Sequence, residues 1–180
     1  AAVGVEEGGR LARRYGDAFA ASYMENFIAQ EAVGDVVELE RAIESGDLCL
    51  NLYRPADSEP DAFRFKIYHP HRPLPLSDVL PVLEHMGLKV IEEMPHAVRP
   101  SDAGMDLVMI HDFGLVSRDG SAVDLARFRD IFQEAFARVW HGDMESDGFN
   151  ALVLGAGLAW REVVILRAFA AYLRQAAIPY

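Results

Sequence analysis

Apolar residues recur at three- and four-residue spacing through the first part of the chain. The positions that share this stripe are Leu11, Tyr15, Ala18, Phe19, Tyr23 and Phe27. This spacing predicts an amphipathic helix from Glu6 to about Glu44, with a bend at Gly34. Gly46 suits the left-handed backbone position that follows a helix, so the helical segment is predicted to end there.

Four stretches in which apolar and polar residues alternate come next, and each predicts a β-strand. They are LCLNLYR (48–54), FRFKIYH (63–69), LKVIEEM (88–94) and MDLVMIHDF (105–113). Ser77 is predicted to cap a helix over 78–86. Ser121, with Asp124 three residues on, predicts the start of a second helix that runs to about residue 140. Two further helices are expected over 147–155 and 159–176.

The predicted order from the first strand to the second helix is β-β-α-β-β-α. Moving the first strand to the end turns it into β-α-β-β-α-β, the ferredoxin-like arrangement. We therefore predict an α+β fold, a circularly permuted ferredoxin-like domain with an antiparallel four-stranded sheet and two helices on one face. The predicted divisions are an N-terminal helical segment (1–46), the α+β domain (47–140) and a C-terminal helical segment (141–180).

The second face of the predicted sheet is too apolar to be wholly solvated, so we expect a partner to cover part of it. Its exposed apolar positions are Tyr53, Tyr68, Ile91, Val108 and Ile110. The stretch 160–173 is apolar on more than one side, which also predicts burial from several directions. Both features favour a homo-oligomer.

Composition narrows the classes of partner. The chain has 28 acidic and 17 basic residues and a net charge of −11, which argues against nucleic acid and anionic membranes. No apolar run is long enough to span a membrane, and no signal peptide opens the sequence. A single Cys49 excludes an internal disulfide and fits a cytoplasmic protein. Neither end looks natural, so we expect a segment of a longer protein.

The acidic stretch DMESDG (143–148) resembles the opening of a calcium-binding loop. Such a loop needs a bidentate Glu at its twelfth position, where this chain has Leu154. A solvated turn is the better interpretation, with Gly142 ending one helix and Asp147 capping the next.

Gly155 and Gly157 resemble the glycine turn of a dinucleotide site. Trp160 stands where a small residue would be needed, because an indole blocks close approach to a pyrophosphate. A turn between two helices is therefore predicted.

The remaining candidates lack the groups that their chemistry requires. His69 and His71 could hold a metal from one side, but the sequence places no third ligand. HDFGL (111–115) contains the kinase triplet without the other kinase motifs. Ser77 has no base placed to activate it.

Arg64 and Lys66 share a strand face and either hold an anion or lie in solvent, with the solvated face favoured. We assign no catalytic, cofactor-binding or metal-binding residue.

Long stretches of the chain resemble the large bacterial NAD-specific glutamate dehydrogenases. They are FIAQEAVGDVVELERAI (27–43), LPLSDVLPVLEHMGLKVIEEMPHAV (74–98), MIHDFGL (109–115) and FQEAFARVWHGDMESDGFNALVLGAGLAWREVVILRAFAAYLRQ (132–175). The resemblance implies an ACT-like, non-catalytic segment upstream of the catalytic domain. It further implies an enzyme that uses NAD to convert L-glutamate to 2-oxoglutarate and ammonia, although no cofactor is expected in this segment.

The partners that the resemblance implies are other domains of the same chain, further copies of it and an amino-acid effector. The loop HPHRPLPL (69–76) lacks the glycine that effector-binding ACT modules place near this turn, which favours a scaffold. The alternative is a stand-alone ACT-like sensor of amino acids. A stop codon directly after Tyr180 would favour the alternative.

Overall fold

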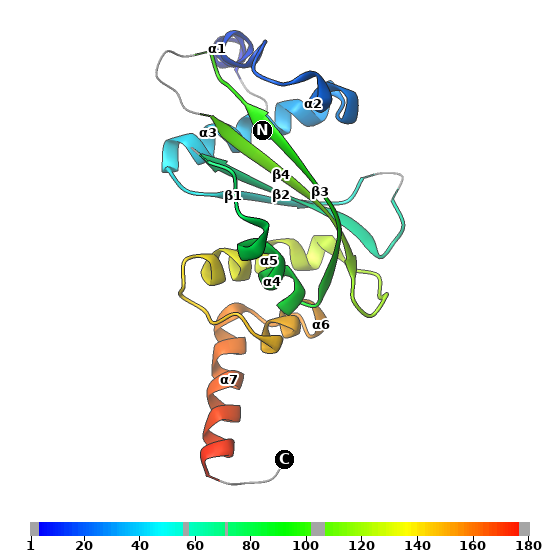
Figure 1. Ribbon diagram of the computed structural model, residues 1–180, viewed down its shortest axis with the longest axis vertical. Helices are drawn as coiled ribbons and strands as arrows, with labels where there is room; N and C mark the ends of the chain where they lie inside the picture. Colours follow the sequence, from blue (N-terminus) through cyan, green and yellow to red (C-terminus); the bar gives the residue numbers. More distant parts are fainter. Residues whose placement is uncertain (1–3, 56–57, 71, 102–106, 177–180) are drawn as a thin grey trace. The chain divides into compact units, whose positions relative to one another are not determined.

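The computed structural model describes residues 4–55, 58–70, 72–101 and 107–176 (Figure 1). Its helices are α1 (Val5–Tyr15), α2 (Ala21–Asn26), α3 (Ala29–Ser45), α4 (Leu76–His85), α5 (Leu125–Trp140), the 3-10 turn η1 (Gly148–Ala151), α6 (Leu152–Gly155) and α7 (Trp160–Gln175). The strands are β1 (Cys49–Tyr53), β2 (Ala62–Pro70), β3 (Leu88–Val98) and β4 (Val108–Ser117). Among the described residues, no helix is long and apolar enough to cross a membrane.

The four strands form one antiparallel sheet in the order β1-β2-β4-β3. This is the order that a permuted ferredoxin-like sandwich requires. In the unpermuted fold the last strand pairs with the first strand, and it keeps that neighbour when it becomes β1 of the permuted chain. The predicted fold class is therefore confirmed. β1 and β2 are neighbours both in sequence and in the sheet, and β3 and β4 are too.

The chain divides into two compact units, and the strands contribute to both. Unit 1 comprises Ala1–Asn51, Phe65–Leu74 and Glu93–Phe113. Unit 2 comprises Leu52–Arg64, Pro75–Glu92 and Gly114–Tyr180. The first unit thus holds helices α1 to α3, and the second holds α4 to α7.

The core of unit 1 lies between the N-terminal helices and the sheet residues of the same unit. It consists of Tyr15, Ala18, Tyr23, Val36, Leu39, Ala42, Tyr68, Val98, Val108 and Ile110. Tyr68, Val108 and Ile110 are at most 1% exposed. Our expectation that a separate partner covers these three residues is therefore wrong, because helices of the same chain cover them. Ile91 of the same predicted face is 66% exposed.

Unit 2 buries apolar side chains from α4, α5 and the strand ends. They include Leu52, Phe63, Val79, Val82, Leu83, Leu88, Leu115, Phe132, Ala135 and Phe136. The Gln133 side chain of α5 accepts a hydrogen bond of 2.7 Å from the backbone N–H of Leu52 in β1. Helix α5 also contacts α4, α6 and α7.

The predicted long N-terminal helix is broken into three. Phe19 leaves the helical conformation to form an antiparallel bridge with Val98. Phe27 is extended, at φ −128° and ψ 140°, which separates α2 from α3. Gly34 lies within α3, which continues through the position of the predicted bend. Gly46 does end α3 with a positive φ of 68°.

Both predicted serine caps are corrected. Ser77 lies in the first turn of α4, and Pro75 occupies the N-cap position. Asp124, not Ser121, caps α5, because its carboxylate accepts from the N–H groups of Ala126 and Arg127. The fourth strand continues to Ser117, beyond its predicted end, and residues 105 and 106 of the prediction lie outside the described part of the chain.

Candidate functional site

The acidic turn at residues 143–148 contacts Arg167, a residue of helix α7. The Arg167 guanidinium donates to both carboxylate oxygens of Asp147, at 2.7 Å and 2.9 Å. It also donates to the Asn150 side chain at 2.7 Å and to the Glu145 carbonyl at 3.3 Å. Hydrogen bonds from Arg167 are the largest cause that lowers the pKa of Asp147. We call these contacts the Arg167 staple.

Ion pairs account for the acidic residues that resemble a calcium-binding loop. Asp143 pairs with Arg138 at 3.0 Å, and Asp147 is occupied by Arg167 while it caps η1 by accepting from the Phe149 N–H. Gly142 follows α5 with a positive φ of 78°. The predicted cap and helix end are both confirmed, and the carboxylates of this turn neutralise arginines of the same unit.

The glycine turn joins two helices, as predicted. Helix α6 ends at Gly155, and α7 begins at Trp160. The indole N–H of Trp160 donates to Glu134 of α5 at 2.9 Å, which fixes the start of α7. Gly157 has a φ of 70°, and a Cβ there would lie 3.2 Å from the Phe128 ring. The glycine is needed for this close approach between helices.

The kinase-like triplet is part of the sheet. Asp112 and Phe113 are fully buried in β4. The Glu92 side chain of β3 crosses over Gly114 to reach Arg64 of β2 at 2.6 Å. A Cβ on Gly114 would lie only 2.8 Å from the Glu92 Cγ. Gly114 therefore leaves room for an ion pair that spans three strands.

Lys66 is buried, although a solvated position was favoured for it. Its ammonium pairs with Asp35 of α3 at 2.7 Å, and both side chains are almost fully buried. The hydroxyl groups of Tyr23 and Tyr68 also donate to Asp35. The expectation of a solvated face is wrong for Lys66. Sequence reasoning missed Asp35, although its place four residues before the buried Leu39 puts an acid on the apolar stripe of α3.

Histidines tie down the proline-rich loop between β2 and α4. The His111 Nε2 accepts from the Leu74 N–H at 3.1 Å, so the ring proton lies on Nδ1, which donates to Glu93 at 2.8 Å. His69 Nδ1 contacts the Arg72 carbonyl at 2.9 Å. His71 lies outside the described residues. The Leu74 N–H is thus hydrogen-bonded within the chain. The sequence pattern did not indicate its contact with His111.

Ser77 and Cys49 have side chains of the nucleophilic type. The Ser77 hydroxyl donates to Asp78 at 3.2 Å. Burial raises the pKa of the Cys49 thiol to about 11, so the thiol is protonated at neutral pH.

A cleft of about 300 Å³ lies within unit 2, where the α4–β3 turn and the β4–α5 loop meet η1 and α6. Its floor is apolar and includes Met86, Phe128 and Leu154, and its rim carries Arg118 and Asp119. We call it the Arg118 cleft. It combines apolar surface with adjacent charges of both signs.

The permuted antiparallel sheet between two helical segments defines the chain as an ACT-like domain with flanking helical motifs. Three domain types of the glutamate dehydrogenase family match successive segments of the chain. Glutamate dehydrogenase helical motif 2 matches 1–42, the glutamate dehydrogenase ACT3 domain matches 47–128, and helical motif 3 matches 144–180. The chain belongs to the family of NAD-specific glutamate dehydrogenases, as a segment of them.

Three relatives carry the name NAD-specific glutamate dehydrogenase. The chain is 44% identical to the protein of Halomonas elongata, over 96% of the chain and 10% of that protein. It is 39% identical to that of Pseudomonas aeruginosa (96% and 11%) and 34% identical to that of Mycobacterium tuberculosis (94% and 10%). The chain thus spans about a tenth of the length of the curated relatives it matches.

Proposed function

We propose that this chain is a non-catalytic assembly segment of an NAD-dependent glutamate dehydrogenase. The complete enzyme would convert L-glutamate, NAD⁺ and water to 2-oxoglutarate, ammonia and NADH in the cytoplasm. The names of the relatives support this activity for the whole protein, and their length places most of each enzyme outside the matched segment. The observation that supports the assembly role is the exposed apolar side of helix α7.

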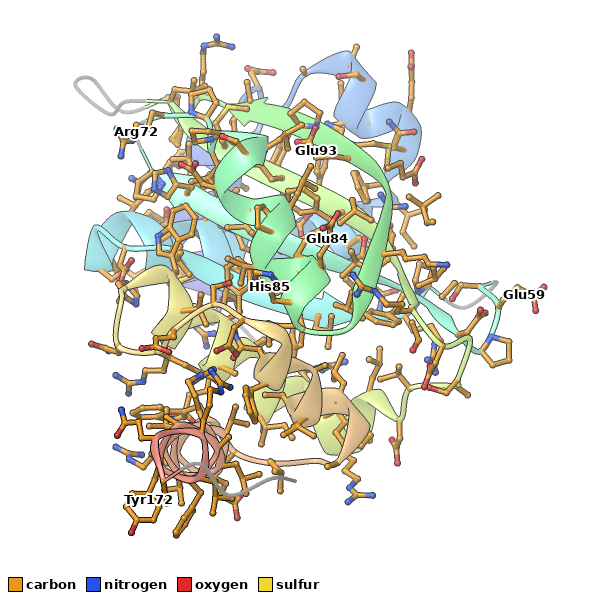
Figure 2. All side chains as sticks on the ribbon, turned by 60° about the horizontal axis from the view of Figure 1, so that its bottom comes forward. Glu59, Arg72, Glu84, His85, Glu93 and Tyr172 are labelled. Carbon is orange, nitrogen blue, oxygen red and sulfur yellow. The ribbon has the colours of Figure 1, made fainter. Side chains whose placement is uncertain are left out.

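Helix α7 is anchored at its beginning and apolar on its outer side. Val163 is fully buried, and Trp160 and Arg167 hold the helix to α5 and to the acidic turn. We call the exposed apolar side chains the outer face of α7. They are Ile165 (54% exposed), Leu166 (41%), Phe169 (61%) and Tyr172 (66%). Figure 2 shows Tyr172 directed away from the helix axis into open space, and Figure 1 shows α7 (orange to red) continuing beyond α5 and α6 of its unit.

An apolar surface of this size favours a partner. Two large aromatic and two aliphatic side chains at these exposures offer roughly 400 Å² of apolar area. Burial of that area is worth about 10 kcal/mol before the costs of association are subtracted. Scattered exposed apolar residues are ordinary, but a contiguous patch of this extent marks an interaction site.

We assign the outer face of α7 to the remainder of the same enzyme. The relatives match this chain over only about a tenth of their length, so a large part of the polypeptide is available to cover it. A contact within one polypeptide also avoids most of the entropy cost that two separate molecules meet on association. The segment would then act as a scaffold that positions neighbouring domains.

The test compares the complete enzyme with this chain alone. Charges at the outer face, in the double variant Phe169→Asp/Tyr172→Asp, should lower the melting temperature of the full-length enzyme by several degrees. They should leave that of the isolated chain unchanged at a dilution at which the chain is monomeric, because no self-association then contributes to its stability. Ile91→Asp is the matched control, because Ile91 of β3 is equally exposed. A full-length enzyme that tolerates the double variant as well as the control would refute the assignment. The chain alone should produce no NADH from glutamate and NAD⁺.

A further inference from the structure

We propose that the outer face of α7 in one copy of this chain docks into an apolar groove between α1 and α3 of a second copy. The groove lies within unit 1 and is a separate surface from the outer face of α7. The contact is a property of the chain by itself and does not rest on the proposed function. In the complete enzyme, a second copy would compete with the rest of the polypeptide for the outer face of α7.

The groove is a concave surface of about 370 Å³, and we call it the α1–α3 groove. Its α1 wall includes Gly8, Ala12 and Gly16, and its α3 wall includes Val33 and Val37. None of its lining residues is charged. The groove therefore favours an apolar occupant, because a charged or polar group would lose its hydration there without gaining a partner.

The α1 wall allows another helix to approach closely. Gly8, Ala12 and Gly16 recur every fourth residue, which places them on one face of α1. A Cβ added at Gly8 would have no atom within 4 Å, so the groove is open at this point. On the other wall, Val33 is 61% exposed and is largely uncovered by the described part of the chain. The distance between two packed helices depends on the side chains at the contact, and small ones shorten it.

The outer face of α7 matches the groove in pattern and length. Ile165, Phe169 and Tyr172 follow one another at four- and three-residue spacing, which is the pattern of a helix that binds in an apolar groove. At about 1.5 Å per residue, these three residues span about 11 Å along the helix axis. The stretch from Gly8 to Gly16 spans about 12 Å by the same measure. One helix face can therefore fill the groove along its α1 wall.

Charges at the ends of the two helices set the direction of docking. Helix α1 has Glu6 and Glu7 in its first turn and Arg13 in its last turn. Helix α7 likewise has an acid, Glu162, in its first turn and a base, Arg174, in its last. Antiparallel docking therefore places acid against base at both ends, whereas parallel docking would place like charges together. The antiparallel arrangement also opposes the two helix dipoles.

A second copy is an occupant that the chain itself supplies. Every copy carries both the groove and the outer face of α7, so the contact requires no other protein. A single contact removes both apolar surfaces from water, which is the main driving force of protein association.

The experiment mixes two variants that each lack one of the surfaces. Phe169→Asp places a charge on the outer face of α7 and leaves the groove intact, and Val33→Asp does the reverse. Each variant alone should be monomeric in sedimentation, because every copy then lacks one of the two surfaces. An equimolar mixture should form a one-to-one heterodimer, with an affinity at least tenfold higher than that of either variant for itself.

Two further variants control the result. Ala12→Asp, on the opposite wall of the groove, should behave as Val33→Asp does. Met24→Asp is the matched control, because Met24 is a similarly exposed apolar residue of unit 1 (66%) that lies outside the groove. It should self-associate as the unaltered chain does. Ala12, Met24 and Val33 are exposed, so these variants should fold, and circular dichroism checks that they do.

A mixture of Phe169→Asp and Val33→Asp that stays monomeric would overturn the proposal, because pairing of α7 with α7 predicts that result. So would a Met24→Asp variant that loses self-association as fully as Val33→Asp does. An unaltered chain that is monomeric up to about 1 mM would also refute it, since weaker association corresponds to only a marginal free energy. If the mixture fails while the α7 double variant still destabilises the full-length enzyme, the docking proposal fails and the proposed function stands.

Discussion

Removal of the Arg167 side chain tests the contact that holds α7 to the acidic turn. The side chains of Arg167 and Asp147 are 13% and 37% exposed, so the pair lies between a surface ion pair and a buried one. Surface pairs are worth about 0.2–1 kcal/mol, and removal of one partner of a buried pair costs about 3–5 kcal/mol. With the solvent exposure of Asp147 taken into account, we expect Arg167→Ala to lower the free energy of unfolding by about 2 kcal/mol.

For a chain of this size, that loss corresponds to a fall in melting temperature of roughly 4–8 °C, measurable by calorimetry. Arg138→Ala is the matched control, because Arg138 is 40% exposed and pairs with Asp143 at a similar distance. The control should lose less than about 1 kcal/mol. If the two variants are equally stable, the staple is an ordinary surface contact and our account of α7 is refuted.

The same pair gives a pH dependence. The pKa of Asp147 is lowered below its ordinary value of 3.8 in the folded state, mainly by hydrogen bonds from Arg167. Its contribution to stability is therefore complete above that value and is lost as the pH falls through the folded pKa. The difference in stability between the chain and Arg167→Ala should be constant near neutrality and shrink below about pH 4.

Gly114→Ala should destabilise the chain by about 1–3 kcal/mol in urea unfolding, because its Cβ meets Glu92, and the cost should largely vanish in a Glu92→Ala background; an additive double variant would contradict this. Lys66→Met should lose about 3–5 kcal/mol because it leaves Asp35 buried without its cation, and a near-neutral result would be incompatible with the pair. Calcium should leave the melting temperature unchanged, and tight one-to-one binding would show otherwise. The isolated chain should self-associate through the outer face of α7, so that Phe169→Asp yields a monomer in sedimentation; an unaffected dimer would place the contact elsewhere.

The sheet was accessible from sequence because its strands alternate in a regular way. Phe63, Phe65 and Ile67 were predicted to share one face of β2, and all three are at most 2% exposed. Lys66 and Tyr68 on the other face are equally buried, which the alternation did not predict. The permuted order followed from counting elements. Single-residue features were less accessible: the break at Phe19 depends on a bridge to Val98, a partner far away in the sequence.

The candidate site illustrates the same limit. Asp143 to Gly148 were correctly interpreted as a cap and turn because capping is a local property. The staple was not predicted, because no local pattern indicates that Arg167, two turns into an apolar helix, contacts Asp147 twenty residues earlier. The Arg118 cleft was missed for a similar reason. Its rim is an ordinary turn sequence, and only the packing of α6 beside it makes a concave surface.

The permuted strand order has a consequence for the speed of folding. In the unpermuted arrangement, the strand equivalent to β1 comes last and must find a partner at the opposite end of the domain. Here β1 and β2 pair as a hairpin, as do β3 and β4, so only the pairing of β2 with β4 spans an intervening helix and strand. Contacts between residues close in sequence form faster than distant ones. A newly synthesised chain can therefore complete its first hairpin once β2 has emerged, and we expect a version with β1 returned to the end to fold more slowly at similar stability.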